Sequence, residues 1–371
     1  THQFFGLSSL LDIPIIRVSL ALGLIWGFVY LNVRGIKSYT NLLIPMVVII
    51  FCLGSIVIFS SFFFDSSDFL ASVAEKSGNP FVPKSDPPFK WLSFLSASAV
   101  LFSSFIGFDA ISQTGSEAIN PRRNLPLAIL IAILGVGLFY FLFTAAVYKI
   151  IPWSFVAEQA LEKDISAPGL LSYVLPYGLD TLIIVGATIA LINDLPAMLL
   201  SVSRLMFAWA KDGVASSRLT YIHPKKNTPV VALVIAGIMA SIGVLGSNFA
   251  GDFFLGIDIM VTSMLVNFLL MCVTLITIKE YNFKLYSEIE VIKSRRLQLI
   301  IGWGGIFFLS IFLIIHLYKD LVSEVEAWYF HSTYVWLIVM GVASLVFYLR
   351  LKKLKTHDKT IMQRFKNLPL E

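Results

Sequence analysis

The chain has 371 residues, of which 57% are hydrophobic and only 14% are charged, whereas roughly a quarter of the residues of a soluble domain are charged. So few charges cannot cover the surface of a soluble protein of this length, and a soluble protein is therefore excluded. The net charge of +5 does not indicate a nucleic-acid partner, because the basic residues lie between apolar runs and form no stripe along one face.

Nine apolar runs are long enough to cross a bilayer, which takes about 18 or more residues. The predicted membrane helices are residues 13–33, 42–63, 92–114, 125–151, 179–211, 229–247, 253–278, 298–318 and 332–351. Residues 352–371 are predicted to form a polar tail. The fold class that follows is an all-α, polytopic membrane protein with a single transmembrane domain over residues 1–371, surrounded by the lipid bilayer.

The loops between these runs alternate in charge. One set of loops, together with the tail, holds 21 of the lysines and arginines; the other set holds 6, and Arg17 lies within the first run. Since basic residues remain on the cytoplasmic side, the tail is predicted to be cytoplasmic and Thr1 external, in a multi-pass protein of the cell membrane. An external start without a signal sequence predicts an odd number of earlier spans before Thr1.

The third run is predicted to be a broken helix. Its polar or flexible residues are Ser103, Ser104, Gly107 and Asp109. Gly costs about 1 kcal/mol relative to Ala in a helix, and Asp at the membrane centre costs several. Both costs fall if the backbone unwinds at about 103–108 and a half-helix begins with Asp109 as its N-cap. Unwound backbone at membrane depth lines cavities and binds substrates in secondary transporters. The alternative is a glycine for close helix packing, with Asp109 in an ion pair.

Catalytic and metal-binding motifs are missing from the sequence. Cys52 and Cys272 both lie inside apolar runs and form neither a disulfide framework nor a CxxC site. The five histidines are scattered, and the sequence contains no HExxH, GxSxG or P-loop motif. We therefore expect no metal site, no cofactor and no enzymatic activity.

Three motifs resemble those of the amino acid–polyamine–organocation transporters. They are Phe105-Ile106-Gly107-Phe108-Asp109-Ala110 followed by Glu117 and Asn120-Pro121-Arg122-Arg123-Asn124-Leu125-Pro126; Ser203–Gly213 followed by His223-Pro224 and Thr228-Pro229; and Leu31-Asn32-Val33-Arg34-Gly35-Ile36-Lys37. The resemblance implies a LeuT-like, inverted-repeat transporter fold of twelve helices, in which the nine runs are helices four to twelve. Helices one to three, including the Gly-rich turn that binds the substrate carboxylate, would then be absent, and we expect residues 1–371 alone not to transport.

The resemblance also implies the function, which is secondary active transport of amino acids by alternating access, as symport or exchange. The substrate-binding residues would be Phe102, Ser103, Ser104, Phe105, Ile106, Gly107 and Phe108. A polyamine or other organic-cation transporter is one alternative, because backbone carbonyls bind amines of either kind. A non-transporting membrane sensor with the same fold is another.

Asp194 is the predicted coupling residue. It follows Asn193 inside the fifth run, where sodium-coupled cousins of the implied fold bind an ion. An ionisable group inside a span is a functional hypothesis by default, so Asp194, with Asn193, is predicted to bind a proton or a sodium ion. The alternative is an aspartate that pairs with a polar group across a helix interface.

Four residues are candidates for gating: Asp109, Glu117, Arg204 and Asp258. Glu117 is predicted to pair with Arg122, Arg123 or Arg204 on the cytoplasmic side, although an exposed ion pair is weak. Asp258, near the outer end of the seventh run, is more simply interpreted as a solvated residue of the vestibule.

Overall fold

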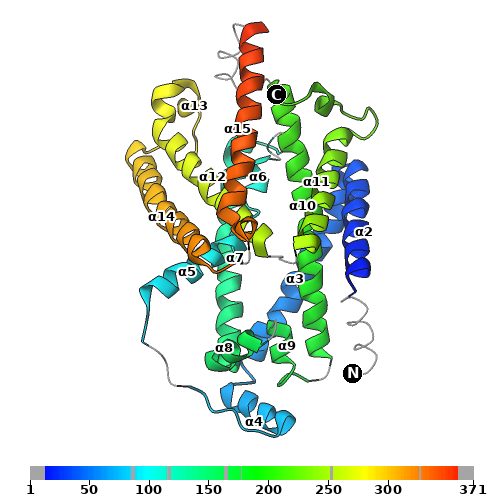
Figure 1. Cartoon of the computed structure of the whole chain (residues 1–371), viewed down its shortest axis with the longest axis vertical. Coiled ribbons are helices and arrows are strands. Elements are labelled where there is room, and N and C mark those ends of the chain that lie inside the picture. The colour runs from blue at the N-terminus through cyan, green and yellow to red at the C-terminus, as the bar shows by residue number, and fades with distance from the viewer. Residues whose placement is uncertain are drawn as a thin grey trace. The chain divides into compact units, whose positions relative to one another are not determined.

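The computed structural model describes residues 13–84, 88–113, 115, 118–162, 166–176, 178–250, 254–325 and 327–357. Within these ranges the regular secondary structure is entirely helical (Figure 1). The chain forms two compact units. The first comprises Thr1–Val33, Lys90–Ile131 and Met198–Glu371, and the second comprises Arg34–Phe89 and Ala132–Ala197.

Eight helices of the described chain are long and apolar enough to cross a membrane. They are α2 (Pro14–Val33), α3 (Ile36–Ser60), α7 (Pro121–Ile150), α10 (Leu179–Lys211), α11 (Val230–Ala250), α12 (Phe254–Tyr281), α14 (Arg295–Val322) and α15 (Ser332–His357). The shorter elements are α4 (Ser66–Ser77), α5 (Trp91–Leu101), η1 (Phe102–Phe105), α6 (Ala110–Gln113), α8 (Trp153–Glu162), α9 (Ala167–Leu171), α13 (Phe283–Ser287), η3 (Ser217–Thr220) and η4 (Trp328–Phe330).

The long helices overlie eight of the nine predicted runs. The exception is the run 92–114, where α5 ends at Leu101 and the chain does not continue as one long helix. At the other end of the chain, α15 continues to His357, so the last helix includes the first residues of the predicted polar tail. Lysine and leucine are good helix formers, and the change from an apolar to a basic sequence there does not interrupt the helix. Residues 358–371 lie outside the described residues.

Glycines set the close packing of α14 on α12 in the first unit. A methyl group on Gly302 would lie 2.7 Å from Cγ1 of Ile276, and one on Gly305 would lie 2.6 Å from Sγ of Cys272. Larger residues at these two positions would force the helices apart. A polar contact also joins α14 and α12: Nε2 of His316 lies 3.2 Å from the carbonyl oxygen of Asp258.

The N-terminus of α15 is capped by Asp320, from the last turn of α14. Its carboxylate accepts hydrogen bonds from the backbone N–H groups of Ser332 and Thr333, both at 2.9 Å, and from the Ser332 hydroxyl at 3.0 Å. Nδ1 of His331 also lies 2.7 Å from the Asp320 carbonyl oxygen. These bonds satisfy amide groups that a helix start leaves without partners, and they fix the turn between α14 and α15.

The second unit contains the larger buried core. Its buried members come from α3, α4, the end of α7, α8, α9 and the start of α10: Val57, Phe69, Val73, Ala146, Val147, Ile150, Ile151, Phe155, Leu170, Leu171, Leu175 and Ile183. Glycines again allow close approach, since a methyl group on Gly54 would lie 2.6 Å from the Phe139 ring and one on Gly186 would lie 2.8 Å from Cβ of Leu53. The short helices of this unit are therefore packed against the ends of the long ones.

Helix α4 begins with a capping box. The Asp65 carboxylate accepts from the backbone N–H of Ser67 at 2.8 Å and of Asp68 at 3.2 Å, while the Asp68 carboxylate accepts from the Asp65 N–H at 3.0 Å. Phe69 and Val73, four residues apart, lie on one face of this helix and are both buried. The cap and the apolar face together account for a helix of only 12 residues.

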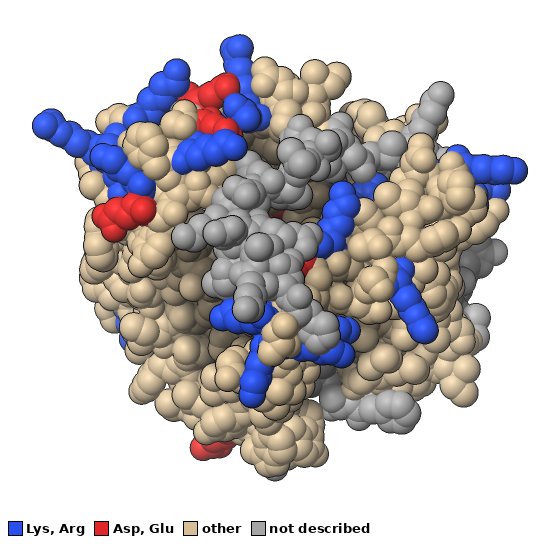
Figure 2. All heavy atoms as spheres, turned by 90° about the horizontal axis from the view of Figure 1, so that it is seen from above, with Lys and Arg blue, Asp and Glu red and all other residues tan. Residues whose placement is uncertain are grey.

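The end of the first unit that carries α13 and the end of α15 is strongly basic (Figure 2). Its lysines and arginines include Lys279, Lys284, Lys293, Arg295, Arg296, Lys352, Lys353 and Lys355. In Figure 2 the blue basic side chains clearly dominate over the red acidic ones. This cluster of basic residues agrees with the uneven distribution of lysine and arginine between the two sets of loops.

Candidate substrate site

The helical ladder is interrupted after α5. The chain makes a 3₁₀ turn, η1, over Phe102–Phe105 and an irregular turn over 106–109. The next backbone bonds run from Ala110 N to Gly107 O at 3.1 Å, from Ile111 N to Phe108 O at 3.3 Å and from Ser112 N to Asp109 O at 3.0 Å. Each spans three residues and not the four of an α-helix, so the ladder is broken through the segment that the sequence singled out.

Gly107 gives this turn its conformation. Its φ of +117° lies in a region that residues with a side chain adopt only with strain. A methyl group on Gly107 would meet no atom within 4 Å, so the backbone here borders open space. The positive φ, and not close packing, is therefore the reason that this position requires glycine.

Contacts among four phenylalanines hold the interrupted segment within the first unit. The ring of Phe108 stacks on Phe268 of α12, and Phe102 contacts the same ring edge-on, with centroids 5.9 Å apart. Phe102 also lies against Phe312 of α14, at 6.5 Å. Phe268 is buried, so both flanks of the break are anchored on a fixed aromatic side chain.

The remaining residues of the predicted substrate segment are partly accessible. Phe105 and Ile106 are half-buried and Ser104 is exposed. The side chain of Ser103 lies outside the described residues, although its backbone belongs to η1. The sequence did not single out Phe268 and Phe312, because nothing distinguishes them from the other phenylalanines (31 in all) of the chain.

Asp109 stands where an N-cap is expected, directly before α6. Its carbonyl accepts from the Ser112 N–H and, at 2.6 Å, from the Ser112 hydroxyl. Within the described residues no capping hydrogen bond to the Asp109 carboxylate is present, so the predicted side-chain cap is not observed there. The half-buried Asp109 side chain therefore lies beside the break and does not cap α6.

The gating candidates are only partly brought together. Glu117 lies outside the described residues, and Arg122 pairs with Glu288, which follows α13, at 3.3 Å. Glu288 was not expected from the sequence, because it is far from Arg122 along the chain. Arg204 is half-buried on α10. Asp258 is half-buried near the start of α12, where its carbonyl also accepts from the Thr262 hydroxyl at 3.0 Å.

Asp194 and Asn193 lie in the part of α10 that belongs to the second unit. The helix continues through Pro196 without a break. Oδ1 of Asn193 is buried and accepts no hydrogen bond from any described residue. Within the described residues no group of three or more His, Cys, Asp or Glu side chains is arranged to hold a metal ion.

A protein with several helices of membrane length and one interrupted apolar helix has the architecture of a secondary transporter. Residues 3–359 match the amino acid permease family, and the chain belongs to this family, within the amino acid–polyamine–organocation superfamily that its motifs resemble. It is therefore a multi-pass membrane protein of the LeuT-like fold class.

Three relatives illustrate the range of the family. The chain is 28% identical to the branched-chain amino acid permease of Bacillus subtilis over 65% of this chain and 47% of that protein. It is 31% identical to the vacuolar cationic amino acid transporter 4 of Arabidopsis thaliana over 42% of this chain and 25% of that protein. It is 27% identical to the low-affinity putrescine importer of Escherichia coli strain K12 over 64% of this chain and 49% of that protein. The matched part thus spans half or less of the length of each relative.

Proposed function

We propose that the protein carries amino acids across the plasma membrane by alternating access, as a symporter or an exchanger. The observation that supports this most directly is the interrupted helix at Gly107, whose backbone borders open space. Carbonyl groups released from a helical ladder accept hydrogen bonds from an ammonium group, and unwound backbone at membrane depth persists only where it lines a cavity. Residues Phe102–Phe108 would receive the amine of the substrate.

The aromatic side chains at the break supply the other chemistry that an amino acid requires. Phe102 and Phe108 would present apolar surface to the side chain of the substrate. Their contacts with Phe268 keep that surface in place while the backbone between them remains irregular. The relatives that carry branched-chain and cationic amino acids fit such a site, in which the amine is bound by backbone and the side chain by packing.

Coupling would take place at Asp194 and Asn193. A buried amide oxygen without a donor costs about 1–3 kcal/mol, and a bound cation would satisfy the Asn193 oxygen while neutralising Asp194. A proton on Asp194 would neutralise its carboxylate but would leave the Asn193 oxygen without a hydrogen-bond donor. The site would therefore bind a sodium ion or a proton, and the protein would need no other cofactor and would perform no enzymatic chemistry.

The basic end of the first unit would face the cytoplasm, since Lys and Arg accumulate on that side of membrane proteins (Figure 2). The end of α15 and the C-terminus would then be cytoplasmic. Amino acids would be delivered to this side or exchanged across it.

A polyamine is the second candidate substrate, favoured by the match to a putrescine importer. Ligand-induced thermal stabilisation separates the candidates, because a ligand that binds only the native state raises the unfolding midpoint. We expect one or more of the twenty amino acids to raise it when the protein carries any residues that naturally precede Thr1. Stabilisation by putrescine alone would favour a polyamine transporter. No stabilisation by any of these ligands would contradict both candidates.

A further inference from the structure

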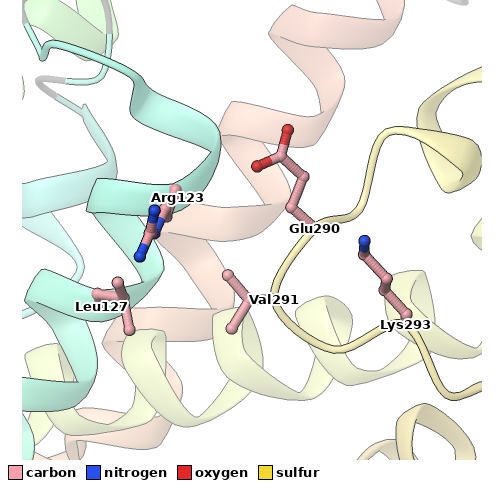
Figure 3. Close-up of a pocket in the computed structure, with 5 residues that line it drawn as sticks. All are labelled: Arg123, Leu127, Glu290, Val291 and Lys293. Carbon is pink, nitrogen blue, oxygen red and sulfur yellow. The ribbon is translucent and has the colours of Figure 1, made fainter.

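A pocket at the basic end of the first unit has no role in the function proposed above. Its volume is about 430 Å³, and it is lined by Arg123 and Leu127 of α7 and by Glu290, Val291 and Lys293 of the linker between α13 and α14 (Figure 3). Figure 3 shows Arg123 and Lys293 on opposite sides, with the side chain of Val291 between them. Two segments that are distant in the sequence thus form one cationic pocket.

The cations of this pocket are available to a ligand. Arg122, the neighbour of Arg123, is engaged by Glu288, but within the described residues neither Arg123 nor Lys293 forms an ion pair. Both side chains are exposed. Glu290 contributes the single negative charge of the lining, so the pocket carries a net charge of +1. An anion is therefore the favoured occupant.

The lining of the pocket also contains two apolar side chains, Leu127 of α7 and Val291 of the linker. Leu127 and Val291 lie below the two cations in Figure 3. Exposed large apolar side chains follow along both helices, namely Leu130 and Ile131 of α7 and Leu297 and Ile300 of α14, next to the exposed Ala128 and Arg296. A free phosphate would use only the cationic part, whereas a phospholipid has a phosphate for the cations and acyl chains for the apolar surface.

The pocket also lies at the depth of lipid headgroups. Arg123 is in the first turn of α7, and Lys293 lies two residues before Arg295, where α14 begins. Both helices are long enough to span the membrane, so their ends lie at the interface between hydrocarbon and water.

We propose that this pocket binds an anionic phospholipid from the cytoplasmic leaflet. Arg123 and Lys293 contact the phosphate and the headgroup, and Leu127 and Val291 contact the glycerol and the first acyl carbons. The lipid bridges the start of α7 and the α13–α14 linker, the same two segments that the Arg122–Glu288 ion pair joins.

The test is native mass spectrometry of the detergent-purified protein, titrated with dioleoylphosphatidylglycerol or with dioleoylphosphatidylcholine. We expect tighter binding of phosphatidylglycerol, weakened about fivefold for each cation removed in Arg123→Gln and Lys293→Gln. Lys225→Gln and Lys226→Gln, which neutralise exposed lysines in the loop between η3 and α11, are the matched controls and should leave this binding unchanged. Glu290→Gln should strengthen it, because the variant removes the only negative charge of the lining.

The thermal midpoint of each variant in neutral detergent reports folding separately. Equal losses in the pocket and control variants would overturn the proposal, because they would indicate nonspecific attraction to the basic face. Full competition by millimolar inorganic phosphate would also overturn it, because the occupant would then be a free anion. Binding that is unaffected by Glu290→Gln and by both pocket variants would place any lipid elsewhere.

Discussion

The ring of Phe108 stacks on the ring of Phe268, with centroids 5.1 Å apart and planes inclined by 17°. This contact joins the interrupted segment after α5 to α12, and Phe102, on the other side of the break, contacts the same ring. The break is thus held at both ends although its backbone has left the α-helical ladder. The segment has an irregular backbone, but its side-chain contacts fix its position. A binding site of defined geometry requires this.

Gly107→Ala is expected to impair substrate binding and transport. A side chain at the φ of Gly107 costs about 1–3 kcal/mol, so the turn should shift and uptake should fall about tenfold or more. Gly304→Ala is the matched control, because a methyl group there also meets no atom within 4 Å but φ is not positive. The measurement is initial uptake into proteoliposomes, with the amount of folded protein checked by gel filtration. Equal uptake by the two variants would contradict a role for the backbone conformation that Gly107 allows.

Asp194→Asn is expected to uncouple transport. The variant cannot lose a proton and attracts a cation less strongly, so accumulation driven by an ion gradient should fall about tenfold, while exchange of substrate for substrate continues. Both modes can be measured in the same proteoliposomes, with a proton or a sodium gradient. Asp212→Asn removes an exposed acid just after the end of α10 and should change neither mode. Loss of both modes in Asp194→Asn would assign this residue a structural role.

Asp320→Ala should destabilise the junction of α14 and α15. The variant removes the acceptor for the Ser332 and Thr333 amides, and loss of an N-cap costs about 0.5–2 kcal/mol. The thermal midpoint should fall by a few degrees, and amide exchange should accelerate in the first turn of α15. Glu324→Ala, a nearby exposed acid, should leave both unchanged. An unaltered exchange rate at Ser332 and Thr333 in Asp320→Ala would show that the cap does not stabilise α15.

Helix α4 should loosen in acid. The Ser67 hydroxyl, followed by the backbone N–H groups of Asp68 and Ser67, lowers the pKa of Asp65 below its ordinary value of 3.8. A carboxyl whose pKa is lower in the folded state stabilises that state above its unfolded pKa, and this stabilisation is lost as the pH falls through the folded value.

Proteolysis by pepsin between about pH 5 and pH 2 tests this sign, since cleavage within α4 should increase toward the acid end. Asp65→Asn retains a capping side chain but cannot titrate, so its α4 should respond less to pH. Glu75→Gln, at an exposed position of the same helix, should behave like the unmodified protein. A steeper response in Asp65→Asn would contradict the assignment.

The long helices and the break could be predicted from the sequence because both are local signals. Apolar runs of membrane length give the helices, and Gly107 and Asp109 in the middle of such a run indicate the interruption. The short helix α4 was missed, although Asp65 and Asp68 form a readable capping-box pattern, because the helix is too short to span a membrane.

The packing partners could not be predicted in the same way. Phe268 reaches the break only because α12 and η1 are neighbours in space, and Glu288 reaches Arg122 across an even longer stretch of sequence. A composition that is apolar all round shows that a helix lies in the membrane but does not show which side faces another helix. Gly302 and Gly305 define that side of α14 only once α12 is in place.

Uptake of a pool of labelled amino acids into proteoliposomes, with proton and sodium gradients both supplied, tests directly whether the protein transports amino acids. The protein should carry any residues that naturally precede Thr1. We predict saturable uptake of at least one amino acid, reduced about tenfold or more by Gly107→Ala and unchanged by Gly304→Ala. No uptake of any amino acid by the well-folded protein would contradict amino acid transport, and uptake that does not depend on Gly107 would contradict substrate binding at the interrupted segment.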